Sequence, residues 1–306
     1  MMSKPAATKR SLFSRISQGP VPWLIPIGVV LLLLFVYPTI EVIRYSFTNA
    51  SILTKDFVYT FGSYRSVFTN PHTYSGLRTT VIFVFFSVIF QVLIGLIVAL
   101  AVDKGEELRM HGTVFVRVAT MLSWAIPGSI VGIIWKLLYV EDATGILITA
   151  LKNTGLNNIS FLTQPASALV CVIIANIWRG SAQSMILSYS GLKTIPKDII
   201  EAANMDGANA WQRFRYVTLP AITPVLSINA VLSTIATFNT FDMIMSLSAG
   251  GPGRAMEVLA LTTYNTIFGS YSLGRGSAYA TLLLLTNVGM GVIYFTFLKK
   301  RSESFQ

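Results

Sequence analysis

The chain has 306 residues, of which 53% are hydrophobic and only 12% charged, and its mean hydropathy is +0.63. A soluble domain carries roughly twice that charged fraction, so the composition excludes an ordinary water-soluble protein and indicates an integral membrane protein. The net charge of +10 does not indicate nucleic-acid binding, because the Lys and Arg residues are scattered at the ends of apolar runs instead of forming a stripe.

Six apolar runs approach the roughly 20 residues that a helix needs to cross a bilayer. We predict an all-α membrane protein whose six transmembrane helices cover residues 21–40, 81–102, 114–138, 166–189, 222–247 and 277–298. They form one transmembrane domain, residues 21–298, between a basic tail of residues 1–20 and a short tail of residues 299–306. Pro127-Gly128 and Pro224 fall within these runs, and membrane helices tolerate such residues where neighbours re-satisfy the backbone.

The first apolar run follows Lys9, Arg10 and Arg15, so it resembles a signal peptide as well as a membrane span. A signal peptide would end in a small-x-small cleavage site, whereas this run continues into Tyr37-Pro38. We therefore expect an uncleaved first span.

Lys and Arg residues are divided unequally between the two sides of the predicted bundle. Fourteen lie on the side of the two tails, eight lie on the other side, and Arg179 lies within a span. Because cytoplasmic loops are richer in these residues, we predict cytoplasmic N- and C-termini. The loop between the fourth and fifth spans, about residues 190–221, is then cytoplasmic too.

The outward loop of residues 248–276 is rich in glycine. Such a composition favours a mobile or tightly turned cap over another pair of helices.

The cytoplasmic loop contains the sequence Glu201-Ala202-Ala203-Asn204-Met205-Asp206-Gly207-Ala208. Pro196 suits the first turn of a short helix, and Gly207 can adopt the left-handed conformation that ends it. A second short helix is expected to run from there to Pro220. Two ordered helices with small Ala residues indicate a docking surface for a partner, because a simple connector needs neither.

Motifs for catalysis and nucleotide binding are absent from the sequence. No Gly-Lys dipeptide occurs, which excludes a Walker A phosphate loop, and neither His-Glu-x-x-His nor Gly-x-Ser-x-Gly is present. The lone Cys171 and the distant His72 and His111 do not have the spacing of a metal site. We therefore predict a non-enzyme with no cofactor of its own, so any nucleotide-driven work must come from a partner.

Polar residues within the spans form two stripes. Asn229, Ser233, Thr237 and Thr240 recur at steps of four, four and three, which places them on one helical face. Asn176, Arg179 and Gln183 do the same in the fourth span. Arg179 is too deep for easy snorkelling, so it indicates a water-filled path. The alternative for the Ser and Thr residues is bonding to their own backbone or packing at a helix interface.

Two further kinds of side chain suit either a structural or a transport role. Asp242, near the outer end, is expected to pair with Arg254 or Arg275 as a structural clasp in preference to a proton relay. Trp178 adjoins Arg179 and can stack against a sugar ring, whereas Trp124 and Trp135 fit interfacial anchoring better.

The loop of residues 201–208, with Phe214 and Leu219-Pro220 after it, resembles the cytoplasmic motif of permease subunits in binding-protein-dependent ABC importers. Asn239-Thr240-Phe241-Asp242 followed by Gly250-Gly251-Pro252 resembles the carbohydrate-uptake branch, which includes the maltose and glycerol-3-phosphate permeases. The resemblance covers about residues 22–300. The basic tail and the early end after the sixth span are similar to the first permease of the usual pair.

The resemblance implies that the loop docks into a cleft of an ATPase subunit, which would hold ATP and Mg²⁺. The coupling residues would be Glu201, Ala202, Ala203, Asp206, Gly207 and Ala208, with Asp242, Gly250, Gly251 and Pro252 as structural positions. Partners would be a second permease, two ATPase copies and an extracytoplasmic solute-binding protein, in the bacterial cytoplasmic membrane.

In the maltose-type branch the sugar is held midway across the membrane. The matching positions here are Ser129, Arg179, Gly180, Gln183, Ser233, Thr237 and Thr240, to which the polar stripes and the indole add Asn229 and Trp178. Arg179 departs from a neutral sugar site, so it either recognises an anionic sugar derivative or complements a carboxylate on the second permease.

Two other functions compete with this interpretation. An ion-coupled secondary transporter should show buried acids and broken helices, and Asp242 is the one acid within the predicted spans. A membrane scaffold that recruits a soluble partner should lack a polar path through its spans.

Overall fold

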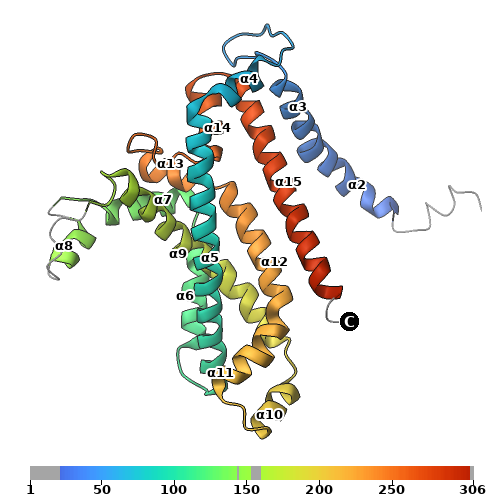
Figure 1. The fold of residues 1–306 in the computed structure, drawn as a ribbon, viewed down its shortest axis with the longest axis vertical. Coiled ribbons are helices and arrows are strands. Elements are labelled where there is room, and N and C mark those ends of the chain that lie inside the picture. Colours follow the sequence, from blue (N-terminus) through green and yellow to red (C-terminus); the bar gives the residue numbers. More distant parts are fainter. Residues whose placement is uncertain (1–20, 143–144, 153–159, 304–306) are drawn as a thin grey trace, which may run out of the picture.

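The computed structural model describes residues 21–142, 145–152 and 160–303, so the predicted tail of residues 1–20 lies outside the described residues. Within them the chain is helical apart from loops and one isolated bridge between Thr48 and Tyr59. Figure 1 shows long helices running between two ends of the molecule, with α10 and α11 at one end and α4 and α14 at the other. The predicted all-α membrane fold is confirmed.

The first span comprises α2 (Val21–Leu31), the π-helical turn η1 (Leu32–Val36) and α3 (Tyr37–Ser46). It continues beyond the predicted end at residue 40, and its apolar side chains are almost all exposed. The π-helical turn ends two residues before Pro38, which lacks the backbone N–H needed to continue the helical hydrogen bonds. The outward loop that follows contains α4 (Gly62–Thr69).

The core forms where α5 (Pro71–Glu107) packs against α9 (Pro165–Lys193). Both helices are longer than the runs that predicted them, and Asn70 caps α5 by accepting a hydrogen bond from the His72 N–H at 3.0 Å. The two backbones approach closely at Gly95, where an added Cβ would lie 2.4 Å from the Ser184 Cβ. This contact fixes the helices that carry most of the polar side chains described below.

The third predicted span is not one helix. It consists of α6 (Thr113–Ala125) and α7 (Gly128–Leu138), which are bent by 104° relative to each other. Ile126 before Pro127 is extended, as a residue before proline usually is, and the expectation of a continuous helix through Pro127-Gly128 was wrong. The described residues contain five helices long and apolar enough to cross a membrane, or six if the bent pair counts as one span.

The fifth span also ends earlier than predicted. α12 (Leu219–Phe238) stops at Asn239, and the residues predicted to continue it form a separate helix, α13 (Asp242–Ser248). α13 packs against α7, where an added Cβ on Gly132 would lie 2.4 Å from the Met243 carbonyl oxygen. Burial of the apolar side chains of Met243, Ile244 and Leu247 stabilises α13 as a helix separate from α12.

The glycine-rich outward loop contains helix, contrary to the expectation of a cap. Its start is tightly turned, with positive φ at Gly250 and Gly253, and Tyr271 near its end also has positive φ. α14 (Leu259–Tyr264) and the π-helical turn η3 (Asn265–Gly269) follow, and Val258 and Leu261 are almost fully buried. The short apolar run at 258–261 therefore outweighs the glycines around it. The last helix, α15 (Leu273–Glu303), packs against α3 and α4.

The loop between the fourth and fifth spans begins with α10 (Lys197–Met205), directly after Pro196. Gly207 has φ +76°, the left-handed conformation expected of it. α11 (Ala210–Arg213) continues through the π-helical turn η2 (Phe214–Thr218) into α12, so the expected separate second helix ending at Pro220 was wrong. Residues Ala210–Phe238 form one 29-residue helix that joins the loop to the fifth span.

The remaining short helix is α8 (Ile146–Lys152), which lies beyond α7 at the side of the bundle (Figure 1).

Candidate functional site

A polar cavity of about 260 Å³ lies between α5, α6, α9, α12 and α13. It brings together the polar stripe of the fourth span and the later residues of the polar stripe of the fifth span, from Ser233 onward. Six of the predicted substrate-path residues line it, namely Arg179, Gly180, Gln183, Ser233, Thr237 and Thr240. The other lining residues are Gln91, Trp124, Asn176, Ala236, Asn239 and Asp242.

Arg179 lies at the midpoint of α9, so about 21 Å of helix extends on either side of it. Its Nε atom is buried and has no hydrogen-bond partner among the residues that the structure describes. In the part of the chain that the structure describes, the guanidinium makes neither a hydrogen bond nor an ion pair. A cation so far from both ends of its span, with its donors unused, is typical of a functional site.

Asn176, one turn before Arg179, is 4% exposed, and its Nδ2 atom also has no hydrogen-bond partner among the described residues. Leaving a buried amide donor unpaired costs about 1–3 kcal/mol. Two residues that line the same cavity therefore each have a buried donor atom without a partner among the described residues. The arrangement offers hydrogen bonds to a solute that brings acceptors.

Gln91 of α5 is a cavity residue that the sequence reasoning missed. Its Nε2 donates to the Asn176 carbonyl oxygen at 3.1 Å, and its side chain lies against Gly180, where an added Cβ would be 2.3 Å from the Gln91 Cδ. Gly180 thus makes room for Gln91. A lone glutamine inside an apolar run was the available signal, because polar residues within spans usually face a cavity or a neighbour.

Asn229 lies outside the cavity, contrary to its predicted place on the substrate path. It is fully buried, and its Oδ1 accepts hydrogen bonds from the hydroxyls of Ser184 at 3.1 Å and Ser233 at 3.3 Å. The residue therefore joins α12 to α9. The same helical spacing that placed it on the stripe extends the stripe past the cavity and into the helix interface.

Two other predicted substrate-path residues also lie outside the cavity lining. Trp178 is 40% exposed and packs edge-to-face against Trp135, with ring centroids 6.1 Å apart. Ser129 is exposed on the first turn of α7, which the bend at Pro127 carries away from α6. Trp124, for which anchoring had seemed the better fit, lines the cavity instead.

The predicted clasp between Asp242 and Arg254 or Arg275 does not form. Arg254 pairs with Glu257, with 2.7 Å between Nη2 and Oε1, and this carboxylate raises the pKa of Arg254. Arg275 donates to the Ser272 hydroxyl at 2.9 Å. Both arginines satisfy a partner three residues away, which explains why neither reaches Asp242.

Asp242 instead faces the N-terminal end of α7. An added Cβ on Gly128 would lie 2.1 Å from the Asp242 Oδ2, so the carboxylate occupies the space that a larger residue would fill. The N-terminus of a helix carries partial positive charge, which favours a carboxylate there. Of the other predicted structural positions, Gly250 is buried against Leu261 and Glu257, and Gly251 and Pro252 complete the turn.

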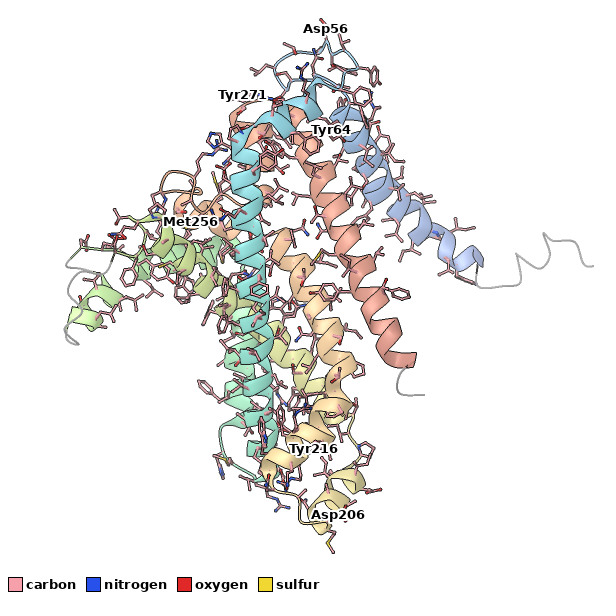
Figure 2. All side chains as sticks on the ribbon, in the orientation of Figure 1. Asp56, Tyr64, Asp206, Tyr216, Met256 and Tyr271 are labelled. Carbon is pink, nitrogen blue, oxygen red and sulfur yellow. The ribbon has the colours of Figure 1, made fainter. Side chains whose placement is uncertain are left out.

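The coupling loop, residues 190–221, presents its predicted residues at one end of the molecule. Figure 2 shows Asp206 and Tyr216 at this end, opposite Asp56 and Tyr271. Glu201, Ala202, Asp206 and Gly207 are exposed, whereas Ala203 and Ala208 are partly buried. Arg213 donates to Asn204 and, at 3.4 Å, to the Ala208 carbonyl oxygen, which ties α11 to the turn.

Large apolar side chains are exposed around the coupling loop. Met205 is 88% exposed, Trp211 68% and Tyr216 74%. Tyr216 also borders a hollow of about 330 Å³, whose other lining residues are Thr194, Ile195, Pro196, Ile199, Val217 and Ala221. Exposed apolar residues rimmed by polar ones mark interaction sites. The loop therefore has the exposed apolar surface that is typical of a docking site, as well as regular helical structure.

An ionic network lies next to the coupling loop and connects three helices. Lys193 at the end of α9 pairs with Asp103 at 2.8 Å and Glu106 at 3.0 Å, both on α5. Glu106 also pairs with Arg117 of α6 at 3.2 Å and accepts a hydrogen bond from the Tyr189 hydroxyl at 2.6 Å. The network holds α5, α6 and α9 together where α9 enters the loop.

Comparison with known proteins tests the resemblance of this chain to the permease subunits of ABC importers. Residues 91–302 match the family described as "Binding-protein-dependent transport system inner membrane component". The chain is 33% identical over 207 residues to the trehalose/maltose transport system permease protein MalF of Thermococcus litoralis, covering 67% of this chain and 68% of the relative. It is 28% identical to the sn-glycerol-3-phosphate transport system permease protein UgpA of Rhizobium meliloti, covering 79% and 80%.

The fold is similar to that of a chain in the crystal structure of a bacterial ABC transporter involved in the import of the acidic polysaccharide alginate. The TM-score is 0.81 at 19% identity, and the match covers 95% of this chain and 99% of the other. The resemblance drawn from the coupling loop is confirmed by the family match. This chain therefore belongs to the inner membrane components of binding-protein-dependent transport systems, as a permease of an ABC importer whose ATPase is a separate subunit.

Proposed function

We propose that this permease moves a sugar or sugar derivative into the cytoplasm, unchanged, by alternating access. It works with a second permease, two ATPase subunits that hold ATP and Mg²⁺, and an extracytoplasmic solute-binding protein. The observation that carries the proposal is that α9 and α12 line the polar cavity and also lead directly into the coupling loop.

The lining of the cavity supports a hydroxyl-rich solute. It combines the amides of Gln91, Asn176 and Gln183 with the hydroxyls of Thr237 and Thr240, and Trp124 offers an indole face. Convergent polar groups fix the orientation of a small ligand, and aromatic faces cover its apolar side. Relatives named for trehalose and maltose or for sn-glycerol-3-phosphate transport have substrates of this general kind.

The proposed coupling follows from helix continuity. Closure of the ATPase dimer would displace the loop, and because Ala210–Phe238 is one helix, the displacement reaches Ser233 and Thr237 directly. The network around Lys193 and Glu106 makes α5 and α6 move with α9. The cavity walls then shift as two bodies, which is how a site opens to one side and closes to the other.

The proposal places the coupling loop and both termini in the cytoplasm, as the Lys and Arg distribution predicts. Lys193 of the network ends α9 where the loop begins, and Arg117 is joined to it through Glu106. The ATPases therefore dock on the side where ATP is available.

Gly207→Pro tests the docking. Proline fixes φ near −65°, so it cannot adopt the φ of +76° at this turn. We expect loss of ATPase copurification and of solute uptake. Gly112→Pro is the matched control, because Gly112 has φ +97° in a neighbouring turn outside the loop. Equal copurification and uptake by Gly207→Pro and wild type would refute docking at this loop.

A further inference from the structure

We propose that the transported solute carries a negative charge, and that Arg179 binds its oxyanion group, a carboxylate, phosphate or sulfonate. This inference rests on the proposed function, because it assigns the solute of the same cavity. It also chooses between the two roles that the sequence left open for Arg179.

The charge of Arg179 is not compensated by this chain. Among the described residues no carboxylate pairs with the guanidinium, whereas Lys193 and Arg117 at the loop end of the bundle both have acidic partners. Arg179 is partly buried, and a charge that is partly removed from water is stabilised by an oppositely charged partner. The solute supplies that partner while the cavity is occupied.

Asp242 is the acid that shares the cavity with Arg179, yet the two do not form an ion pair. Its carboxylate lies against Gly128 at the positive end of the 11-residue helix α7, which compensates its charge locally. The cavity therefore keeps a separate acidic and basic side. The basic side is the one with unused donors.

Asn176 adds an independent observation on the basic side. Within the described part of the chain, neither its buried Nδ2 atom nor the Arg179 Nε has a hydrogen-bond partner. Three residues of separation put the two side chains on one face of α9. Both groups donate hydrogen bonds. A neutral sugar hydroxyl accepts a hydrogen bond from one such donor at a time. An oxyanion accepts from both, and its oxygens match the paired N–H groups of the guanidinium.

Both unused donors are buried and belong to residues that line the cavity of this chain. A carboxylate on the second permease would have to enter the same cavity to reach Asn176, and it would then occupy the place of the solute. Burial therefore favours the solute over the partner subunit as the acceptor.

The test uses the complete complex, copurified with its ATPases and binding protein and reconstituted in vesicles. The solute that the binding protein retains is identified by mass spectrometry and supplied at saturation with saturating binding protein. Its neutral analogue, in which the carboxylate is reduced to an alcohol or the phosphate or sulfonate is replaced by hydroxyl, is supplied in parallel. Initial uptake is measured for wild type, Arg179→Gln and Arg179→Lys.

We expect an anionic solute, and uptake by Arg179→Gln about 30-fold below wild type, the lower range for removing one partner of a buried charge pair. Arg179→Lys keeps the charge without the fork and should fall between them. Arg179→Gln should also lose the preference for the anionic solute over its neutral analogue, while the complex still assembles.

A neutral retained solute would overturn the inference, and so would full uptake of an anionic one by Arg179→Gln. Loss of complex assembly in Arg179→Gln and Arg179→Lys alike would also overturn it, by assigning Arg179 to the second permease. Absence of ATP-dependent uptake of any solute by the wild-type complex would instead refute the proposed function.

Discussion

Substitution of Gly95 by alanine tests the packing that holds the cavity together. The new Cβ would lie 2.4 Å from the Ser184 Cβ and 2.7 Å from the Met185 backbone nitrogen, so α5 and α9 would have to separate by about 1 Å to restore van der Waals contact. Rigid backbone lies on the far side of the contact, which leaves no flexible side chain to move aside. Overpacking of this kind costs about 1–3 kcal/mol.

The matched control is Gly289→Ala, in the interior of α15, where an added Cβ meets nothing within 4 Å. Alanine in a helix interior is favoured over glycine by about 1 kcal/mol, so this variant should be unchanged or stabilised. We expect Gly95→Ala to lower the unfolding temperature of the detergent-purified complex and Gly289→Ala not to lower it. Equal unfolding temperatures for the two variants would refute the close approach of α5 and α9.

Two further pairs of variants separate structural from transport roles. Asn229→Ala removes the acceptor of two buried hydroxyls and should destabilise the complex by about 1–3 kcal/mol. Gln183→Ala, at a position that lines the cavity, should reduce uptake and leave the unfolding temperature unchanged. The opposite pattern would contradict the structural role of Asn229 and the transport role of Gln183. Lys193→Met should change stability by at most about 1 kcal/mol because the ion pairs of Lys193 are partly exposed, yet it should lower uptake per ATP hydrolysed. The control Lys104→Met removes an ion pair outside the network and should leave that ratio unchanged. Equal uptake per ATP hydrolysed in the two variants would contradict the role of the network.

The sequence predicted the membrane class, the general positions of the spans and the coupling loop, because apolar length and the left-handed turn at Gly207 are local properties. It could not predict the bend at Pro127. Membrane helices tolerate proline when neighbours compensate it, and the deciding contacts of Gly128 and Gly132 come from α13, more than a hundred residues away.

The polar stripes of the fourth and fifth spans predicted much of the cavity lining, and they also produced the incorrect assignments. Period 3.6 places Asn229 with Ser233, but it does not say where along the helix a cavity gives way to a helix interface. Gln91 lies on another helix, and its contact with Gly180 depends on how α5 crosses α9. The partner of Asp242 was wrong for a similar reason, since the end of α7 is not visible as a charge in the sequence.

The central claim is that the coupling loop controls which side of the membrane the cavity opens to. It is tested most directly by membrane-impermeant thiol labelling of Thr237→Cys, a cavity position, in a Cys171→Ser background that removes the one native cysteine. We predict that ATP binding to the complex moves the reactivity of this cysteine from one side of the membrane to the other, and that Gly207→Pro abolishes the change. Labelling from the same side with and without ATP, or a change that survives Gly207→Pro, would contradict the claim.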